Sequence, residues 1–271
     1  MANYKYWEDF IKEWIDSENF KLTNKKICGW TSPNLPPVLI NDPQKKDLSS
    51  DYIPEPWWGN DGTQPLHSVV INFNPGAGGP NQLREKFPKG LSYSKDVVWN
   101  QSILPDTRKW HKSKRAMRIL NTLYRQDCIR KPYGLDNHLS VELVPWHTKG
   151  VDNDFYAYLK QNIKAVYENS ICFAANRSRE IENDKLNSVV IVRMSNDNIQ
   201  IIMDGLKHLG VESDIVSTGV TASGLGSYME FRLSSLSDIR FISIWGKQSW
   251  NDFPPNAEMD EIFNNSSLNF E

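Results

Sequence analysis

The chain has 271 residues, of which 39% are hydrophobic and 11% aromatic, and its formal net charge at pH 7 is −2. This length is enough to bury a substantial core, and so small a net charge excludes a protein whose whole surface is a polycation for nucleic acids. The three cysteines, Cys28, Cys128 and Cys172, are too far apart for a paired-cysteine zinc site, a four-cysteine iron–sulfur cluster or a disulfide framework.

The first predicted element is an amphipathic helix over residues 4–16, whose aromatic and aliphatic side chains recur at helical spacing. The chain starts with MANYKYWEDFIKEW, which lacks the apolar centre of a signal peptide, and no apolar run reaches membrane-spanning length. We therefore expect a cytoplasmic protein that does not enter a membrane. Residues 31–65 are rich in Pro, Asn and Asp, which predicts an extended loop. We expect residues 1–271 to form one domain, with this helix and loop packed on it.

From residue 68 onward, apolar strands alternate with helices. Strands are expected at residues 68–73, 139–146, 188–195, 227–233 and 239–245, and helices at residues 117–126, 152–170 and 196–210. This alternation predicts an α/β fold with a central, mainly parallel sheet flanked by helices.

The stretch VVINFNPGAGGP, residues 69–80, combines the end of the first strong strand with a run of glycines. Ligands of such sheets bind beyond the carboxyl ends of the strands, which is where this run falls. No Gly-Lys-Ser/Thr follows, so it is not a Walker loop, and its glycines do not fit the dinucleotide-binding pattern. A plain turn remains an alternative.

Two motifs in this order resemble those of the uracil-DNA glycosylase superfamily. Asn72-Phe73-Asn74-Pro75-Gly76 resembles the motif that activates water, which is Gly-Gln-Asp-Pro-Tyr in the strict uracil branch and Gly-Ile-Asn-Pro-Gly in the mismatch-specific, thymine-DNA glycosylase-like branch. Thr221-Ala222-Ser223-Gly224-Leu225-Gly226 is similar to the Asn-Pro-Ser-Gly-Leu-Ser loop of the mismatch-specific branch. VELVPWHTKG, residues 141–150, also resembles segments of less characterised relatives. The resemblance covers residues 50–235 and implies a three-layer sandwich.

The resemblance implies a monofunctional DNA glycosylase that needs neither cofactor nor metal. Such an enzyme flips out a pyrimidine and hydrolyses its N-glycosidic bond, which leaves an abasic site. Asn74 matches the residue that orients the water, and His147, Ser223 and backbone amides are candidates for stabilising the departing base. His147 is equally well explained as a structural histidine. Asn72, Thr221 and Ala222 depart from the family motifs, and the His of the strict branch's second motif is missing.

Several residues are candidates for holding the base. Phe73 and Phe87, together with Trp57 and Trp58, are rings on which a flipped base can stack, although most such rings serve packing. Glu142 is either an acceptor that reads the base or a structural hydrogen-bond partner. Gly76 replaces the Tyr with which the strict branch crowds the 5-position of the pyrimidine. The resemblance therefore favours a mismatched or bulky C5-modified base, such as the hydroxymethyl- or glucosyl-hydroxymethylcytosine of phage DNA, and a role in defence against phage.

The partner implied by this resemblance is DNA, and no obligate protein partner is evident. The predicted DNA contacts are Gly224 and Leu225 in the second motif and a basic run formed by Arg108, Lys109, Lys112, Lys114, Arg115 and Arg118. A solvated helix face is the alternative explanation of the run. Two other functions remain open: a catalytically inactive nucleic-acid-binding module of the same fold, and a nucleoside or nucleotide hydrolase.

Overall fold

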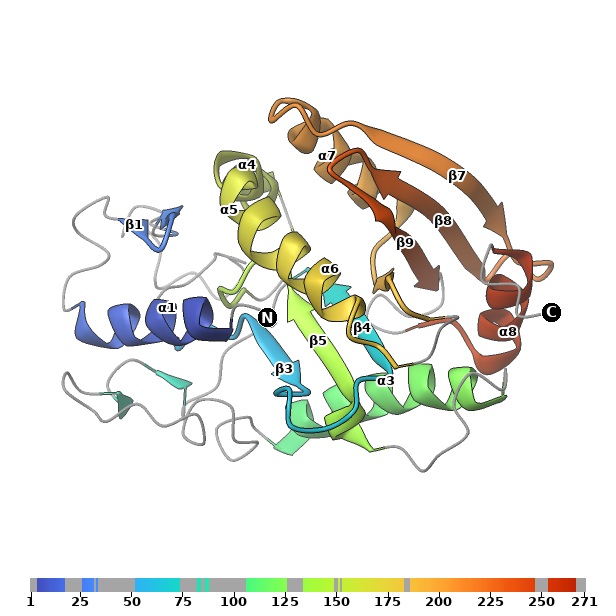
Figure 1. Ribbon diagram of the computed structural model, residues 1–271, viewed down its shortest axis with the longest axis horizontal. Helices are drawn as coiled ribbons and strands as arrows, with labels where there is room; N and C mark the ends of the chain where they lie inside the picture. The colour runs from blue at the N-terminus through green and yellow to red at the C-terminus, as the bar shows by residue number, and fades with distance from the viewer. Residues whose placement is uncertain are drawn as a thin grey trace.

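A computed structural model of the chain describes twelve ranges of residues, and the statements below concern these alone. They are residues 4–17, 26–31, 33, 52–73, 82–83, 86–87, 106–125, 134–148, 151, 153–182, 186–246 and 253–266, with no side chains described for residues 106–113. Figure 1 shows their arrangement around a central sheet.

The central sheet has seven strands in the order β3-β5-β4-β6-β9-β8-β7. The strands are β3 (Trp57–Gly59), β4 (Ser68–Asn72), β5 (His138–Glu142), β6 (Val189–Val192), β7 (Ser213–Val220), β8 (Gly226–Leu233) and β9 (Leu236–Gly246). The middle strands β5, β4, β6 and β9 are parallel, whereas β3, β8 and β7 pair antiparallel at the two sides. The α/β class is therefore confirmed, and the sheet is mixed. A separate hairpin joins β1 (Lys26–Ile27) and β2 (Trp30–Thr31).

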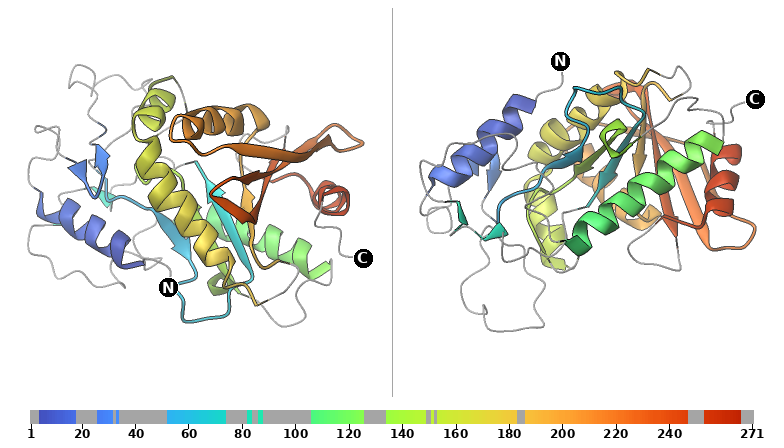
Figure 2. Two further views of the ribbon diagram at one scale, coloured as in Figure 1. Left: turned by 45° about the horizontal axis from the view of Figure 1, so that its top comes forward. Right: turned by 90° about the horizontal axis from the view of Figure 1, so that it is seen from below.

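Helices lie on both faces of this sheet (Figure 2). One face carries α4 (Asn153–Gln161), α5 (Ile163–Ala165), the π-helical turn η6 (Val166–Ile171), α6 (Cys172–Ser178) and α7 (Asn196–Lys207). The other face carries α3 (Asp106–Arg125) and α8 (Asn256–Asn265). Successive strand residues point to opposite faces, so Ile71 and Val192 meet Ile199 of α7 while their neighbours face α3 and α8. A short 3-10 turn, η5 (Leu135–Asn137), precedes β5.

The N-terminal helix α1 (Tyr4–Asp16) docks on the core through a face of rings. Trp7, Phe10 and Trp14 are fully buried. The Phe10 ring lies 5.4 Å from that of Trp146, and the Trp14 ring lies 6.0 Å from that of Phe87. Because burying each such side chain contributes roughly 1.5–3 kcal/mol, this face is enough to hold the helix in place. The predicted helix over residues 4–16 is confirmed.

Other elements differ from the sequence prediction at their ends. Helix α3 begins at Asp106, well before residue 117, and the helix expected over residues 152–170 continues through a π-helical turn to Ser178. The strand expected over residues 139–146 ends at Glu142. Helix α7 starts at Asn196 as predicted, and its cap is Ser195, whose hydroxyl accepts from the Asn198 amide.

Several elements were not predicted, including the short strands β1 and β2 and the turn η5. Strand β3 lies inside the expected loop of residues 31–65. Strand β7 is largely exposed at the edge of the sheet, so its sequence lacks a clear apolar face. Helix α8 is short and follows two prolines, Pro254 and Pro255.

Candidate functional site

Three polar residues stand side by side where three neighbouring parallel strands end. Asn72, the last residue of β4, is in register with Glu142, the last residue of β5. Ile71 is in register with Val192, which places Asn72 beside Arg193, one residue past β6. The three side chains share one face of the sheet, and neighbouring strands are about 4.8 Å apart. We call Glu142, Asn72 and Arg193 the carboxyl-edge row.

The carboxyl-edge row is almost entirely removed from water. Glu142, Asn72 and Arg193 are 3%, 7% and 9% exposed. The Nε of Arg193 donates to Oδ1 of Asn72 at 2.9 Å, and its backbone amide donates to the Ile71 carbonyl at 2.9 Å. Among the residues that the structure describes, Nδ2 of Asn72 has no hydrogen-bond acceptor. Burying charged and amide groups costs free energy unless their hydrogen bonds are made, so such a row is typical of a binding site.

Beyond the row, the chain after β5 follows the chain after β4. The Leu143 amide donates to the Asn72 carbonyl at 2.7 Å, and the Val144 amide donates to the Phe73 carbonyl at 2.9 Å. Phe73 itself is 8% exposed, and its ring packs edge-on against Phe155 at 5.8 Å. The predicted catalytic Asn74 and the predicted base-facing Gly76 follow directly in sequence and lie outside the described residues.

Of the four candidate stacking rings, Phe73 and Phe87 do not contact each other. Phe73 is at the end of β4, whereas Phe87 packs against Trp14 of α1 at 6.0 Å. The other two candidate rings, Trp57 and Trp58, are buried residues of β3. The described contacts of all four rings are therefore those of core residues.

His147 is a buried residue that joins two segments. Its Nε2 lies 2.9 Å from the Ile53 carbonyl, to which it can donate, and 3.8 Å from Oε1 of Glu55. Glu55 in turn accepts from the side-chain amide of Gln82, and its backbone amide donates to Pro145 at 2.9 Å. These contacts fit the structural explanation of His147, because they hold the chain before β3 against the chain after β5.

The second motif forms the turn between β7 and β8. Gly226 is in register with Gly246 at the carboxyl end of β9, so this turn lies at the same edge of the sheet as the carboxyl-edge row, with β6 and β9 between β4 and β8. Gly224 has φ +71°, a conformation that favours glycine, and its amide donates to the Thr221 carbonyl at 2.7 Å. The side chain of Leu225 is half-buried in this turn.

Helix α8 holds this turn through two glutamates. Ser223 and Thr221 both donate their hydroxyls to Glu258, the former at 2.5 Å, and the Ala222 amide donates to Glu261 at 2.8 Å. The hydrogen bond from Ser223, and then that from Thr221, lower the pKa of the Glu258 carboxyl. The predicted base-binding hydroxyl of Ser223 is therefore engaged in fixing the turn.

The basic run lies on α3. Lys114 is exposed and Arg115 half-buried, while Arg118 donates to the Phe253 carbonyl at 2.6 Å. Ala116 packs against Trp58, and Leu135 lies against both. Because Leu135 precedes β5, this part of the run lies toward the amino ends of the parallel strands. The side chains of Arg108, Lys109 and Lys112 lie outside the described residues.

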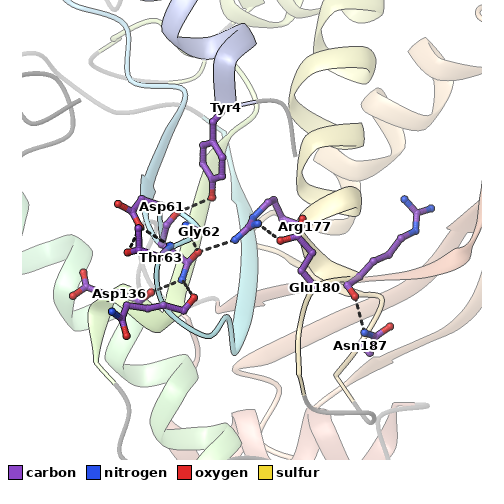
Figure 3. Close-up of polar contacts among 11 residues, drawn as sticks. Tyr4, Asp61, Gly62, Thr63, Asp136, Arg177, Glu180 and Asn187 are labelled. Carbon is purple, nitrogen blue, oxygen red and sulfur yellow. Dashed lines mark hydrogen bonds and ion pairs between the residues drawn. The ribbon is translucent and has the colours of Figure 1, made fainter. Parts of the chain in front are cut away.

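A second buried polar cluster lies at the opposite edge of the sheet (Figure 3). Asn60, which follows β3, uses Nδ2 to donate to the carbonyls of Gln64 and Asp136 at 2.9 and 2.6 Å. Its Oδ1 accepts from the Gly62 amide at 2.9 Å and from Arg177 at 2.7 Å. We call Tyr4, Asn60, Arg177 and Glu180 the amino-edge network.

The remaining members of this network connect two helices to it. The Tyr4 hydroxyl of α1 donates to the Asn60 carbonyl at 2.9 Å. Arg177 of α6 also pairs with Glu180, and its guanidinium lies 5.2 Å from the centre of the Tyr4 ring. The amino-edge network therefore joins α1, α6 and the chain after β3.

Sequence reasoning missed most of the residues of both clusters. Only Glu142 was among the candidates, whereas Asn72 counted as a departure from a motif and Arg193 was not considered. The sequence did contain a signal for the last two: a polar residue follows each apolar stretch, Asn72 in VVIN and Arg193 in VVIVR.

Within the described ranges, no three His, Cys, Asp or Glu residues are grouped so that they could hold a metal ion, and no helix there is long and apolar enough to cross a membrane. Comparisons of the chain with protein-family models, with curated proteins and with solved structures found no match.

Proposed function

We propose that the protein is a monofunctional DNA glycosylase with a uracil-DNA glycosylase-like fold, acting on a pyrimidine that carries a substituent at C5. The observation that supports this most is the carboxyl-edge row. The Asn72-Phe73-Asn74-Pro75-Gly76 motif begins inside it, at the end of a strand with parallel neighbours on both sides. That is the edge at which α/β sheets bind ligands.

The reaction replaces the bond between the sugar C1′ and the base nitrogen by a bond between C1′ and a water oxygen. The electron pair of the broken bond leaves with the base, and the water loses a proton. Asn74 is the residue proposed to orient this water. The positive charge of Arg193, buried at the same edge, suits stabilisation of the negative charge on the departing base.

The substrate follows from the residues around Asn74. Gly76 stands where the strict uracil branch has Tyr, and Ala77, Gly78 and Gly79 follow, so none of these side chains can crowd the 5-position. A hydroxymethylated or glucosylated cytosine of phage DNA is such a base. The basic run and Leu225 are the proposed DNA contacts.

An abasic-site assay over DNAs with normal, deaminated and C5-modified bases tests the proposal. We expect the wild type to release a C5-modified pyrimidine and Asn74→Ala to lose release by at least about 100-fold while it still binds DNA. Asn264→Ala, exposed on α8, is the matched control and should behave as the wild type.

Two results would favour the other functions. DNA binding without release of any base would indicate an inactive binding module. Release from free nucleosides, unaffected by changing Lys112, Lys114 and Arg115 to Glu, would indicate a nucleoside hydrolase. In a glycosylase, the same triple substitution should weaken DNA binding and reduce its salt dependence.

A further inference from the structure

We propose that strand β7 is an interaction surface for a second copy of this chain. The β7 strands of the two copies pair antiparallel across a two-fold axis, so that their sheets join into one. Among the described strands, β7 is last in the sheet order, and β8 is the only strand that pairs with it (Figure 1). An edge strand carries a row of N–H and C=O groups that point away from its sheet, and these groups readily pair with another strand. The proposal does not depend on the enzymatic function.

Strand β7 lacks two features with which many proteins protect a sheet edge. It is 8 residues long, and it contains neither lysine nor proline. Among the residues that the structure describes, five large hydrophobic side chains are exposed, and three of them, Ile215, Val216 and Val220, belong to this strand. They are 47%, 46% and 60% exposed. Apolar side chains that gather on an exposed edge are typical of a surface that another protein covers.

The pairing of β7 with β8 determines which backbone groups of β7 are left for a partner. In an antiparallel pair, successive residues alternately point their N–H and C=O groups toward the neighbouring strand and away from it. Just before β7, the Glu212 carbonyl accepts from the Ser234 amide at 2.8 Å, and just after it the Thr221 amide donates to the Gly226 carbonyl at 2.9 Å. The residues that flank β7 on both sides therefore point toward β8.

A bulge at Val216 makes the outward-pointing residues symmetric about the middle of the strand. The register of β7 with β8 shifts between Ile215 and Ser217, so Val216 is one extra residue that interrupts the alternation. Alternation from both flanks gives the set of residues whose backbone groups point away from β8. They are Ser213, Ile215, Thr218 and Val220. This pattern is the same when it is read in either direction along the strand.

That symmetry allows β7 to pair with itself over its full length. When two copies align antiparallel, Ser213 of each faces Val220 of the other, and Ile215 faces Thr218. Each outward-pointing residue then meets another outward-pointing residue, with which it can exchange two hydrogen bonds. In a regular strand of the same length, the same alignment would set every outward-pointing residue against one that points inward. The bulge therefore fits the strand for a second copy of itself.

The side chains and the charge of β7 fit the same register. The outward-pointing residues pair with every second residue of β8, so their side chains share one face, where Ile215 and Val220 of both copies would gather. Asp214 is the only charged residue of β7. In the antiparallel register it faces Gly219 of the other copy, and the two Asp214 residues are about 17 Å apart along the strands. A parallel register would place them side by side, which is destabilising.

Sedimentation velocity of the full-length protein tests the proposal. Over a range from about 1 to about 100 μM, we expect a dimer at the high end that dissociates on dilution. Thr218→Pro removes the amide that points toward the second copy and no bond to β8, so it should raise the dissociation constant of the dimer at least about 10-fold. Thr218→Ala keeps that amide and is the matched control. A wild type that stays monomeric, or a dimer that Thr218→Pro leaves unchanged, would overturn the proposal.

Hydrogen exchange of the wild type is a second test, and it decides the question even where Thr218→Pro fails to fold. The amides of Thr218 and Val220 should exchange at least about 3-fold more slowly at the high concentration than at the low one. The Gly219 amide points toward β8, so its exchange should not depend on concentration. Equally fast exchange of Thr218 and Val220 at both concentrations would contradict the proposal. Slow exchange at both would show that something other than a second copy covers the edge, and would overturn it as well.

Discussion

The amino-edge network and the carboxyl-edge row both contain a buried arginine bonded to a buried asparagine, but the asparagines differ in what else they bind. Asn60 also satisfies the backbone groups of Gly62, Gln64 and Asp136. The side chain of Asn72 is bonded, within the described residues, to Arg193 alone. A buried polar group that completes the backbone has a structural reason to be there. One that binds only another side chain leaves capacity for a ligand, and this distinguishes the two edges.

The largest expected effect comes from removing each asparagine in turn. Asn60→Ala removes several hydrogen bonds at once and leaves buried backbone groups without partners. We therefore expect the free energy of unfolding to decrease by about 3 kcal/mol or more. Asn72→Ala removes the bond to Arg193 and should cost about 1 kcal/mol. Denaturant unfolding of the two variants measures both values. Equal losses would show that the two edges do not differ in this way.

The next prediction concerns the pH dependence of stability, which we expect to come from the amino ends of the strands. His138, the first residue of β5, lies between the hydroxyls of Ser68 and Ser140, and burial lowers its pKa to about 3. The unfolded chain takes up this proton near pH 6.5, whereas the folded protein does not until about pH 3. Stability is therefore fully present above pH 6.5 and decreases as pH falls, by about 2 kcal/mol at pH 5.

Unfolding free energies at pH 7 and pH 5 test this contribution. His138→Gln keeps a polar group between the two hydroxyls but cannot be protonated, so its stability should depend less on pH in this range. The control is His208→Gln, because His208 is exposed after α7. An unchanged pH dependence in His138→Gln would contradict the assignment.

A smaller effect tests the attachment of α1 to the amino-edge network. Tyr4→Phe keeps the ring contacts with Trp57 and Phe173 and removes only the hydroxyl that donates to Asn60. We expect a loss of about 1 kcal/mol in unfolding free energy. Ligand binding at the proposed carboxyl-edge site should be unchanged, because that site lies at the other edge of the sheet. Asn264→Ala, exposed on α8, is the control.

The sequence predicts the parts of the fold that depend on local pattern. Strand β4, helix α1 and helix α7 were found within a few residues of their expected positions, because each carries a strong apolar periodicity. Strand β7 was missed because an exposed edge strand buries too little to leave a pattern in the sequence.

The candidate site depends on register, which the sequence does not contain. Only the pairing of the strands and its register place three residues in one row, namely Glu142, Asn72 and Arg193. The role expected of Ser223 illustrates the same point, because its partner Glu258 is far away in the chain. The position of a polar residue at a strand end is predictable, but its neighbours are not.

The smallest expected effect is that of acid on the turn at the carboxyl edge, which we compare with the effect of acid on the amino edge. Because hydrogen bonds from Ser223 and Thr221 lower the pKa of Glu258, its contribution is present above the pKa of an unfolded glutamate and is lost as pH falls through the lower, folded value. We therefore expect the turn at residues 221–226 to stay attached to α8 at pH 5, where the amino edge has already lost stability through His138. Protection factors of the amides in this turn, measured by hydrogen exchange between pH 6 and pH 3, should fall only below about pH 4.5. Glu258→Gln should show low protection throughout, and a turn that keeps its protection in that variant would show that the two hydroxyl contacts do not hold it.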